Sequence, residues 1–158
     1  MVLARRASLL LAGFIALGIA SASGAATPRF EDYSVAVEVI KNPAQVRIID
    51  AQSRRYRSQL RDASRHAPDF AGHFVLATWG CGASCVMAAA IDAKTGVVTR
   101  LPFTVSNWPL EVTEPLVYKP DSRLLVIHGS RNEKGNGIYY YELIGHVFKL
   151  VGENGVKP

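Results

Sequence analysis

The sequence has few of the residues that most often bind metals or act as nucleophiles: two cysteines and four histidines among 158 residues. A zinc site needs four ligands, usually cysteine and histidine side chains at short spacing. The histidines, His66, His73, His128 and His146, are scattered along the chain instead. Ser84 also lacks the G-x-S-x-G context of a hydrolase nucleophile. We therefore predict no metal site and no cofactor, and we find no complete catalytic set.

The sequence also has little excess charge. Its formal net charge is +5, and Arg5 and Arg6 contribute two of the 18 basic residues. Without these two, 16 basic residues stand against 13 acidic ones, a net charge near +3. Proteins that bind nucleic acid usually carry a denser basic surface. Nucleic acid is therefore not an expected partner.

The first 25 residues have the three parts of a secretory signal peptide. Arg5 and Arg6 supply positive charge, residues 7–20 are apolar and uncharged, and small residues fill positions 21–26. A membrane span needs ~20 apolar residues, more than this apolar core contains. We expect export to the periplasm or outside the cell, with no transmembrane segment in the mature chain. The expected cleavage positions follow Ala22, Ala25 and Ala26.

Residues 26–158 are long enough to form a single globular, β-rich domain with its own core. Residues 86–92 are apolar on both faces, which predicts a central strand covered on both sides. The fold class predicted is α+β and mostly β: an antiparallel meander of about six to eight strands with one packed amphipathic helix. Strand-like patterns cover residues 33–39, 46–49, 73–80, 86–92, 97–103, 116–119, 123–128, 138–143 and 146–151. A polar loop is expected at residues 131–137, between two of these strands.

Residues 50–66 have the period of a helix. Asp50 suits the N-cap, because its carboxylate can accept hydrogen bonds from the free amides of the first turn, and Pro68 ends the helix. One apolar stripe consists of Tyr56, Leu60, Ala63 and Ala67. A second stripe, which we call the arginine face, consists of Arg54, Arg57, Arg61 and Arg65. It is either an ordinary solvated helix surface or a weak contact for an anionic surface.

Cys81 and Cys85 flank three residues that suit the loop of a β-hairpin. Facing residues at the base of a hairpin have Cα atoms ~4.5–5.5 Å apart, a separation that a disulfide can bridge. An even cysteine pair in an exported protein favours a disulfide. The C-x-x-x-C spacing differs from the C-x-x-C of thioredoxin-like proteins. A cysteine nucleophile with His73 as base is an alternative that requires a free thiol.

One long segment carries a resemblance to other proteins. The run FAGHFVLATWGCGASC (residues 70–85), preceded by RRYRSQLRDA and followed by IDAKTG and PDSRLLVI, resembles a group of uncharacterised exported bacterial proteins. Those proteins have an N-F-A-G-H-Y…W-G-C-G-x-x-C stretch after an arginine-rich helix. This chain has Asp69 and Phe74 in place of the asparagine and the tyrosine. The resemblance spans most of the mature domain; it implies export and no particular activity.

Three hypotheses of function follow from the sequence. The leading one is a non-catalytic periplasmic or secreted binding protein of the cell envelope, whose partner is an envelope protein or a ligand. The second is a hydrolase or thiol-dependent enzyme centred on His73 and Cys81/Cys85, with His128 as a further catalytic candidate. The third is binding to an anionic surface through the arginine face.

Overall fold

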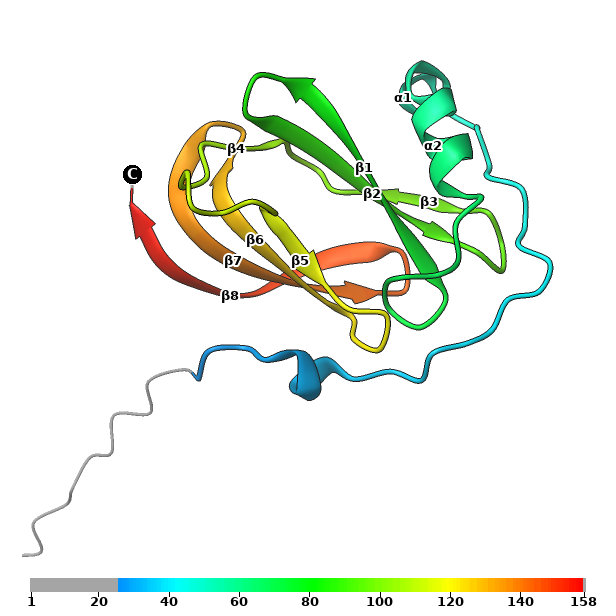
Figure 1. The fold of residues 1–158 in the computed structure, drawn as a ribbon, viewed down its shortest axis with the longest axis horizontal. Helices are drawn as coiled ribbons and strands as arrows, with labels where there is room; N and C mark the ends of the chain where they lie inside the picture. The colour runs from blue at the N-terminus through cyan, green and yellow to red at the C-terminus, as the bar shows by residue number, and fades with distance from the viewer. Residues whose placement is uncertain (1–25, 158) are drawn as a thin grey trace, which may run out of the picture.

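The computed structural model describes residues 26–157, so the predicted signal peptide lies outside the described residues. Eight strands form a single antiparallel sheet, which bends so that its two halves face each other (Figure 1). Two short helices cover the outer side of one half. This architecture confirms the predicted α+β class with mostly β structure.

The strands follow one another with few long connections. The strands are β1 (Phe74–Gly82), β2 (Cys85–Asp92), β3 (Val98–Arg100), β4 (Val105–Ser106), β5 (Leu116–Tyr118), β6 (Leu124–Arg131), β7 (Lys134–Ile144) and β8 (Val147–Lys157). The helices are the 3-10 helix η1 (Phe30–Tyr33), α1 (Ala51–Arg55) and α2 (Arg57–Ala63). The sheet order is β1-β2-β4-β6-β7-β8, while β3 pairs with β2 and β5 pairs with β6 beside this path.

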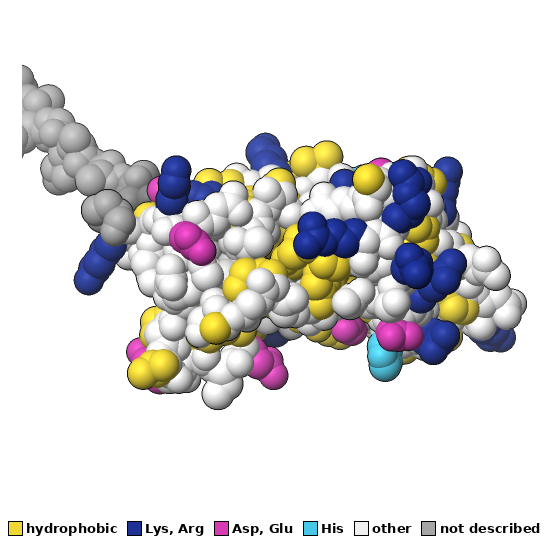
Figure 2. Space-filling view, turned by 90° about the horizontal axis from the view of Figure 1, so that it is seen from above, with side chains coloured by type: hydrophobic (Ala, Val, Ile, Leu, Met, Phe, Trp, Pro, Cys, Tyr) yellow, Lys and Arg dark blue, Asp and Glu magenta, His cyan; other side chains and the backbone are white. Residues whose placement is uncertain are grey.

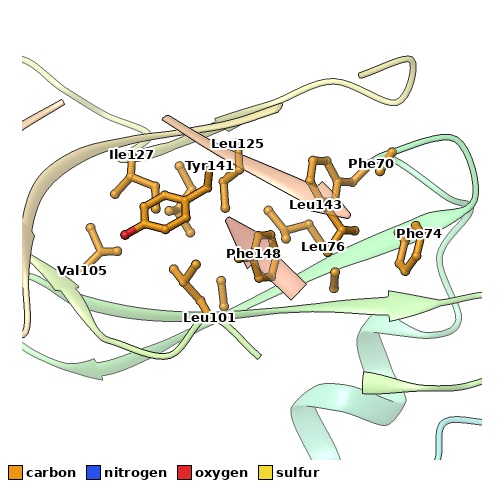
Figure 3. Packing of buried hydrophobic residues seen from close by; sticks show 14 of the residues in the cluster. Phe70, Phe74, Leu76, Leu101, Val105, Leu125, Ile127, Tyr141, Leu143 and Phe148 are labelled. Atoms are coloured by element: carbon orange, nitrogen blue, oxygen red, sulfur yellow. The ribbon is translucent and has the colours of Figure 1, made fainter. Parts of the chain in front are cut away.

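The main core lies between the two halves of the sheet (Figure 3). Leu76 from β1 and Phe148 from β8 meet there with Leu125 and Ile127 from β6. β2 is covered on both faces, as predicted: Ala88 and Ala90 pack in this core, while Ala89 and Ile91 pack under the helices. The two-sided apolar pattern of residues 86–92 therefore reflects burial on both sides of the sheet.

Two smaller apolar clusters cover the outer faces. Under α2, Leu60 packs against Val75, Ala77 and Trp79 of β1. On the opposite outer face, Tyr140 packs with Phe30 and Tyr33 of η1. Tyr139 and Tyr141 point into the main core instead. Successive strand residues point to opposite faces, so the strand pattern of residues 138–143 by itself places Tyr140 on the face opposite to its two neighbours.

The single helix predicted over residues 50–66 is in fact two helices. The chain leaves helical geometry at Tyr56 (φ −105°, ψ 23°), and the Tyr56 ring packs 5.1 Å from the Trp79 ring. The predicted N-cap is confirmed: the Ser53 backbone N–H donates to Asp50 Oδ1 at 2.8 Å. At this break the Tyr56 ring joins Leu60 of α2 in the apolar cluster on β1.

The N-cap predicts a pH effect. The Ser53 N–H and then the Arg100 side chain lower the pKa of Asp50 from 3.8 to about 2. A lowered pKa in the folded state stabilises the fold above pH 3.8, and this contribution is lost as the pH falls towards 2. We expect Asp50→Asn, which keeps a capping side chain, to show a smaller fall in melting temperature from pH 5 to pH 2 than the wild type. An equal fall in melting temperature in the two proteins would contradict the lowered pKa of Asp50 in the folded state.

The prediction of strands over residues 33–39 and 46–49 is wrong, since neither range forms a strand. The N-terminal segment (residues 26–49) runs outside the sheet towards α1 (Figure 1). Its backbone N–H groups bond to separate loops: Glu38 to the Gly72 carbonyl at 2.9 Å and Arg47 to the Gly96 carbonyl at 2.7 Å. The alternating valines do not mark a buried face, since Val39 is 86% exposed.

The prediction of a polar loop over residues 131–137 is also wrong, since β6 ends at Arg131 and β7 begins at Lys134. β6 and β7 are joined by a two-residue turn, Asn132-Glu133, in which both residues have positive φ angles (50° and 64°). Such a turn matches the twist of a hairpin. Gly137 belongs to β7, where a Cβ atom would lie 2.8 Å from the Val156 Cα. A glycine at position 137 therefore allows β7 and β8 to approach each other closely; it is not part of a turn.

Candidate functional site

The two cysteines form the predicted disulfide. Cys81 and Cys85 are bonded at the end of the β1–β2 hairpin, with their Cα atoms 5.2 Å apart. Residues 80–84 are exposed, and the hairpin end lies at the upper edge of the molecule in Figure 1. Both cysteines of the chain are therefore held in one exposed disulfide, and we call residues 80–85 the disulfide hairpin.

Removing this disulfide is expected to have a modest effect on stability. It closes a ring of only a few residues, for which the loss of chain entropy corresponds to about 2 kcal/mol. Because Cys81 is exposed, little packing is lost in the Cys81→Ser/Cys85→Ser double variant. We expect urea denaturation to show a free energy of unfolding lower by about 2 kcal/mol or less. Failure of the variant to fold would contradict this estimate.

His73 and Cys81 are not brought together. His73 precedes β1 and Cys81 lies near its other end, so about 26 Å of strand separates them at ~3.3 Å per residue. His73 instead contacts acidic side chains. Its Nδ1 lies 3.2 Å from Glu38 Oε1, without the alignment of a hydrogen bond, and its Nε2 lies 3.6 Å from Asp92 Oδ1.

The group around His73 holds the N-terminal segment against the sheet. Lys94 Nζ lies 2.6 Å from Glu38 Oε2, and the Lys94 hydrogen bond is the main cause that lowers the pKa of Glu38. The nearly buried Asp92 carboxylate accepts from the Lys94 backbone N–H at 2.8 Å and from Thr95 Oγ1 at 2.8 Å. Asp92 therefore stabilises the turn that follows β2, a common role for aspartate.

This group is poorly arranged for acid–base chemistry. A general base needs a nitrogen or oxygen directed at the substrate proton. Both ring nitrogens of His73 face carboxylates, of Glu38 and Asp92. Sequence analysis did not find the role of Glu38, because nothing in its neighbourhood distinguishes it from an exposed residue of a strand.

His128 lies on β6 beside a different hollow. This hollow has a volume of about 660 Å³ and is bordered by Glu111, Asn136, Ile138 and Lys157 among others. Neither His73 nor a cysteine belongs to its lining. The three catalytic candidates from the sequence therefore occupy three separate places in the fold.

A hollow that the sequence did not suggest lies between α1, β3 and the β7–β8 turn. It has a volume of about 520 Å³. Arg100 donates to Asp50 at 2.8 Å on one side of it, and Thr99 lies 3.3 Å from His146 on another. These polar groups pair with one another, and only Thr99 among them is buried, so among the described residues the hollow holds no buried polar group that needs a ligand as its partner.

The arginine face is exposed, as predicted. All four of its arginines lie at the surface, and Figure 2 shows basic side chains gathered over the end of the molecule that carries the helices. Arg65 pairs with Asp62 at 3.4 Å. Asp62 is the only acidic residue between positions 51 and 68. The helices therefore present a surface of strongly positive charge.

The chain was compared with protein-family models, with curated proteins and with solved structures, and none of them matches. Within residues 26–157, no helix combines the length and the apolar character needed to cross a membrane.

Proposed function

We propose that the chain is an exported, non-catalytic binding protein of the cell envelope, either periplasmic or secreted. The observation that carries this proposal is the exposed disulfide that contains both cysteines. Disulfides persist in oxidising compartments such as the periplasm and are reduced in most cytosols. The signal-like pattern of residues 1–25 supports the same location.

The contacts of the catalytic candidates support a binding role over an enzymatic one. Cys81 is bonded to Cys85 and therefore offers no thiolate. His73 is held between Glu38 and Asp92. Each of these side chains has a role in holding the fold together, and a small rigid β domain with such supports is suited to presenting a surface.

A panel of turnover assays tests this proposal. The protein, purified from the periplasm of cells that express the full chain, is incubated with a peptide, an ester and a peptidoglycan fragment. We expect no turnover above that of a buffer control. Turnover that is lost in His73→Ala or in Cys81→Ser but kept in the control His66→Ala would overturn the proposal, because His66 is exposed and lies outside the His73 group.

A second candidate function is contact with an anionic surface, favoured by the exposure of the arginine face. We expect binding to phosphatidylglycerol vesicles at low ionic strength that weakens at high salt, because salt screens exposed charges. Replacing the four arginines by glutamine should weaken binding at least tenfold. A control with the same change in charge replaces the exposed residues Lys41, Arg47, Lys149 and Lys157 by glutamine. Equal losses of vesicle affinity in the two variants would show that the vesicles are attracted by the net charge of the protein and not by the arginine face.

A further inference from the structure

The outer edge of β1 is a free sheet edge. Among the described residues, 26–157, β1 has β2 as its single strand partner, and Thr78 lies opposite Ala88. The Ala88 carbonyl accepts from the Leu101 N–H at 2.9 Å, on the side of β2 away from β1. In an antiparallel pair of strands, two residues directly opposite each other either exchange backbone hydrogen bonds or both direct their N–H and C=O groups away from the partner strand. The backbone N–H and C=O of Thr78 therefore point to the outer edge of β1.

Backbone groups two residues apart on a strand point to the same side, so the N–H and C=O of Gly80 also point to the outer edge of β1. Gly80 lies opposite Val86, which pairs with Val105 of β4 on its other side. Two residues before Thr78, the N–H of Leu76 is occupied, since it donates to Asp69 Oδ1 at 2.9 Å. Within residues 26–157, no such partner lies against the outward backbone groups of Thr78 and Gly80. These are strong hydrogen-bonding groups that are suited to another extended chain.

Two hollows flank this edge, one on each face of the sheet. The hollow towards the main core has a volume of about 260 Å³ and is lined by Thr78, Glu114, Leu116 and Tyr118 among others. The hollow towards α2 has a volume of about 380 Å³, and Thr78 and Asp69 also line it. An added strand sends alternate side chains to opposite faces. Its side chains would therefore enter the two hollows in turn.

β8, the strand at the opposite end of the path from β1, is protected in a way that β1 is not. β8 carries Lys149 and Lys157, and its pairing with β7 is shifted in register at two places. Lysines and bulges of this kind prevent edge-to-edge pairing. Between Phe74 and Gly80, β1 pairs in regular register and has no charged side chain. The geometry therefore favours strand addition at β1.

The charges beside the edge indicate which peptide fits. Glu114 borders one hollow and Asp69 borders the other. The Asp69 carboxylate accepts from the Leu76 N–H and from the Tyr118 hydroxyl, at 2.9 and 3.3 Å. Glu114 is exposed. A cationic side chain on the added strand would be attracted to these carboxylates.

We propose that the edge of β1 from Thr78 to Gly80 binds an extended, basic peptide segment as an additional strand of the sheet. Backbone hydrogen bonds hold the segment, its Lys or Arg side chains lie on the face beside Glu114, and its apolar side chains enter the hollow towards α2, beside Val75 and Ala77. This inference rests on the proposed binding function and names its partner: a basic stretch of polypeptide in extended conformation.

The probe that tests it is a fluorescein-labelled peptide of alternating lysine and valine, nine residues long. We expect fluorescence polarisation to show saturable binding to the full chain as purified from the periplasm. The same peptide with alternate amides N-methylated should not bind, because it cannot form the ladder. Hydrogen exchange at the Thr78 and Gly80 amides should slow at least tenfold on binding. Equal binding of the N-methylated peptide, or slowing at β8 instead, would overturn the assignment.

Two variants locate the contact. Thr78→Pro removes an outward N–H that makes no hydrogen bond within the sheet, and proline is tolerated on edge strands; it should weaken binding at least tenfold. Thr78→Val, which keeps the N–H and changes the side chain alone, is the control. Glu114→Lys changes an exposed side chain and should reverse the preference, so that a glutamate–valine peptide binds better than the lysine–valine peptide. Unchanged affinity in both folded variants would overturn the inference. So would a dimer of the wild type that Thr78→Pro dissociates, since a second copy would then occupy the edge.

The outcomes separate this inference from the function on which it rests. No peptide binding at millimolar concentration, together with no turnover of any substrate, overturns the inference and leaves a binding protein with another contact surface. Turnover that depends on His73 overturns the proposed function whatever the peptide result.

Discussion

Replacing Ile127 by alanine is expected to lower the free energy of unfolding by about 2–5 kcal/mol. Ile127 is fully buried on β6, in the main core between the two halves of the sheet (Figure 3). Alanine removes three carbon atoms from a densely packed site, and the neighbours close the resulting cavity only in part. Such a loss is large beside the total stability of a small domain, roughly 5–15 kcal/mol.

The matched control for this variant is Ile144→Ala. Ile144 ends β7 and its side chain is 48% exposed, so the same change of residue there should cost well under about 1 kcal/mol. Urea denaturation followed by circular dichroism measures both variants, and an unchanged slope with denaturant shows that the same surface is exposed on unfolding. Equal losses at the two positions would contradict the two-layer arrangement.

Replacing Gly96 by alanine is the second change with a large expected effect. Gly96 has a φ of +73°, and a Cβ atom there would lie 2.0 Å from the Gln45 carbonyl oxygen. The N-terminal segment must therefore move away, and the hydrogen bond from the Arg47 N–H to the Gly96 carbonyl is disturbed. We expect a loss on the order of 2–3 kcal/mol from backbone strain and displacement together.

Gly145→Ala is its control. Gly145 also has a positive φ, +56°, but a Cβ atom there would meet nothing within 4 Å. Alanine at position 145 should lower the free energy of unfolding by only about 1 kcal/mol, because it must adopt the left-handed conformation without any steric clash. Hydrogen exchange supplies a second readout, because the Arg47 amide should lose protection in Gly96→Ala and keep it in Gly145→Ala. Similar exchange in both variants would show that the N-terminal segment is not held at Gly96.

The parts of the fold predicted correctly are those in which burial decides the pattern. Residues 86–92 are apolar on both faces because both faces of β2 are covered. The alternation of Tyr139, Tyr140 and Tyr141 follows the two sides of β7 in the same way. The alternation of residues 33–39 gave a wrong prediction. Among the described residues this segment makes one isolated bridge, Ser34 to Ser122, and its other N–H groups bond to loops of different elements.

The site could be predicted only where residues are close in sequence. Cys81 and Cys85 lie across one hairpin, so their spacing was enough to predict the disulfide. The contact of His73 with Glu38 joins residues 35 positions apart, through a segment without regular structure. The free edge of β1 depends on which strand is last in the sheet, and this is a property of the topology that no local pattern contains.

We propose that this chain is exported to an oxidising compartment, where the Cys81–Cys85 disulfide forms. The most direct measurement is the intact mass of the protein, isolated from cells that express the full chain and treated with an alkylating agent without reduction. We predict the mass of a chain cleaved after Ala22, Ala25 or Ala26, with no alkyl group added. A chain that still begins at Met1 and carries alkyl groups on both Cys81 and Cys85 would contradict the account.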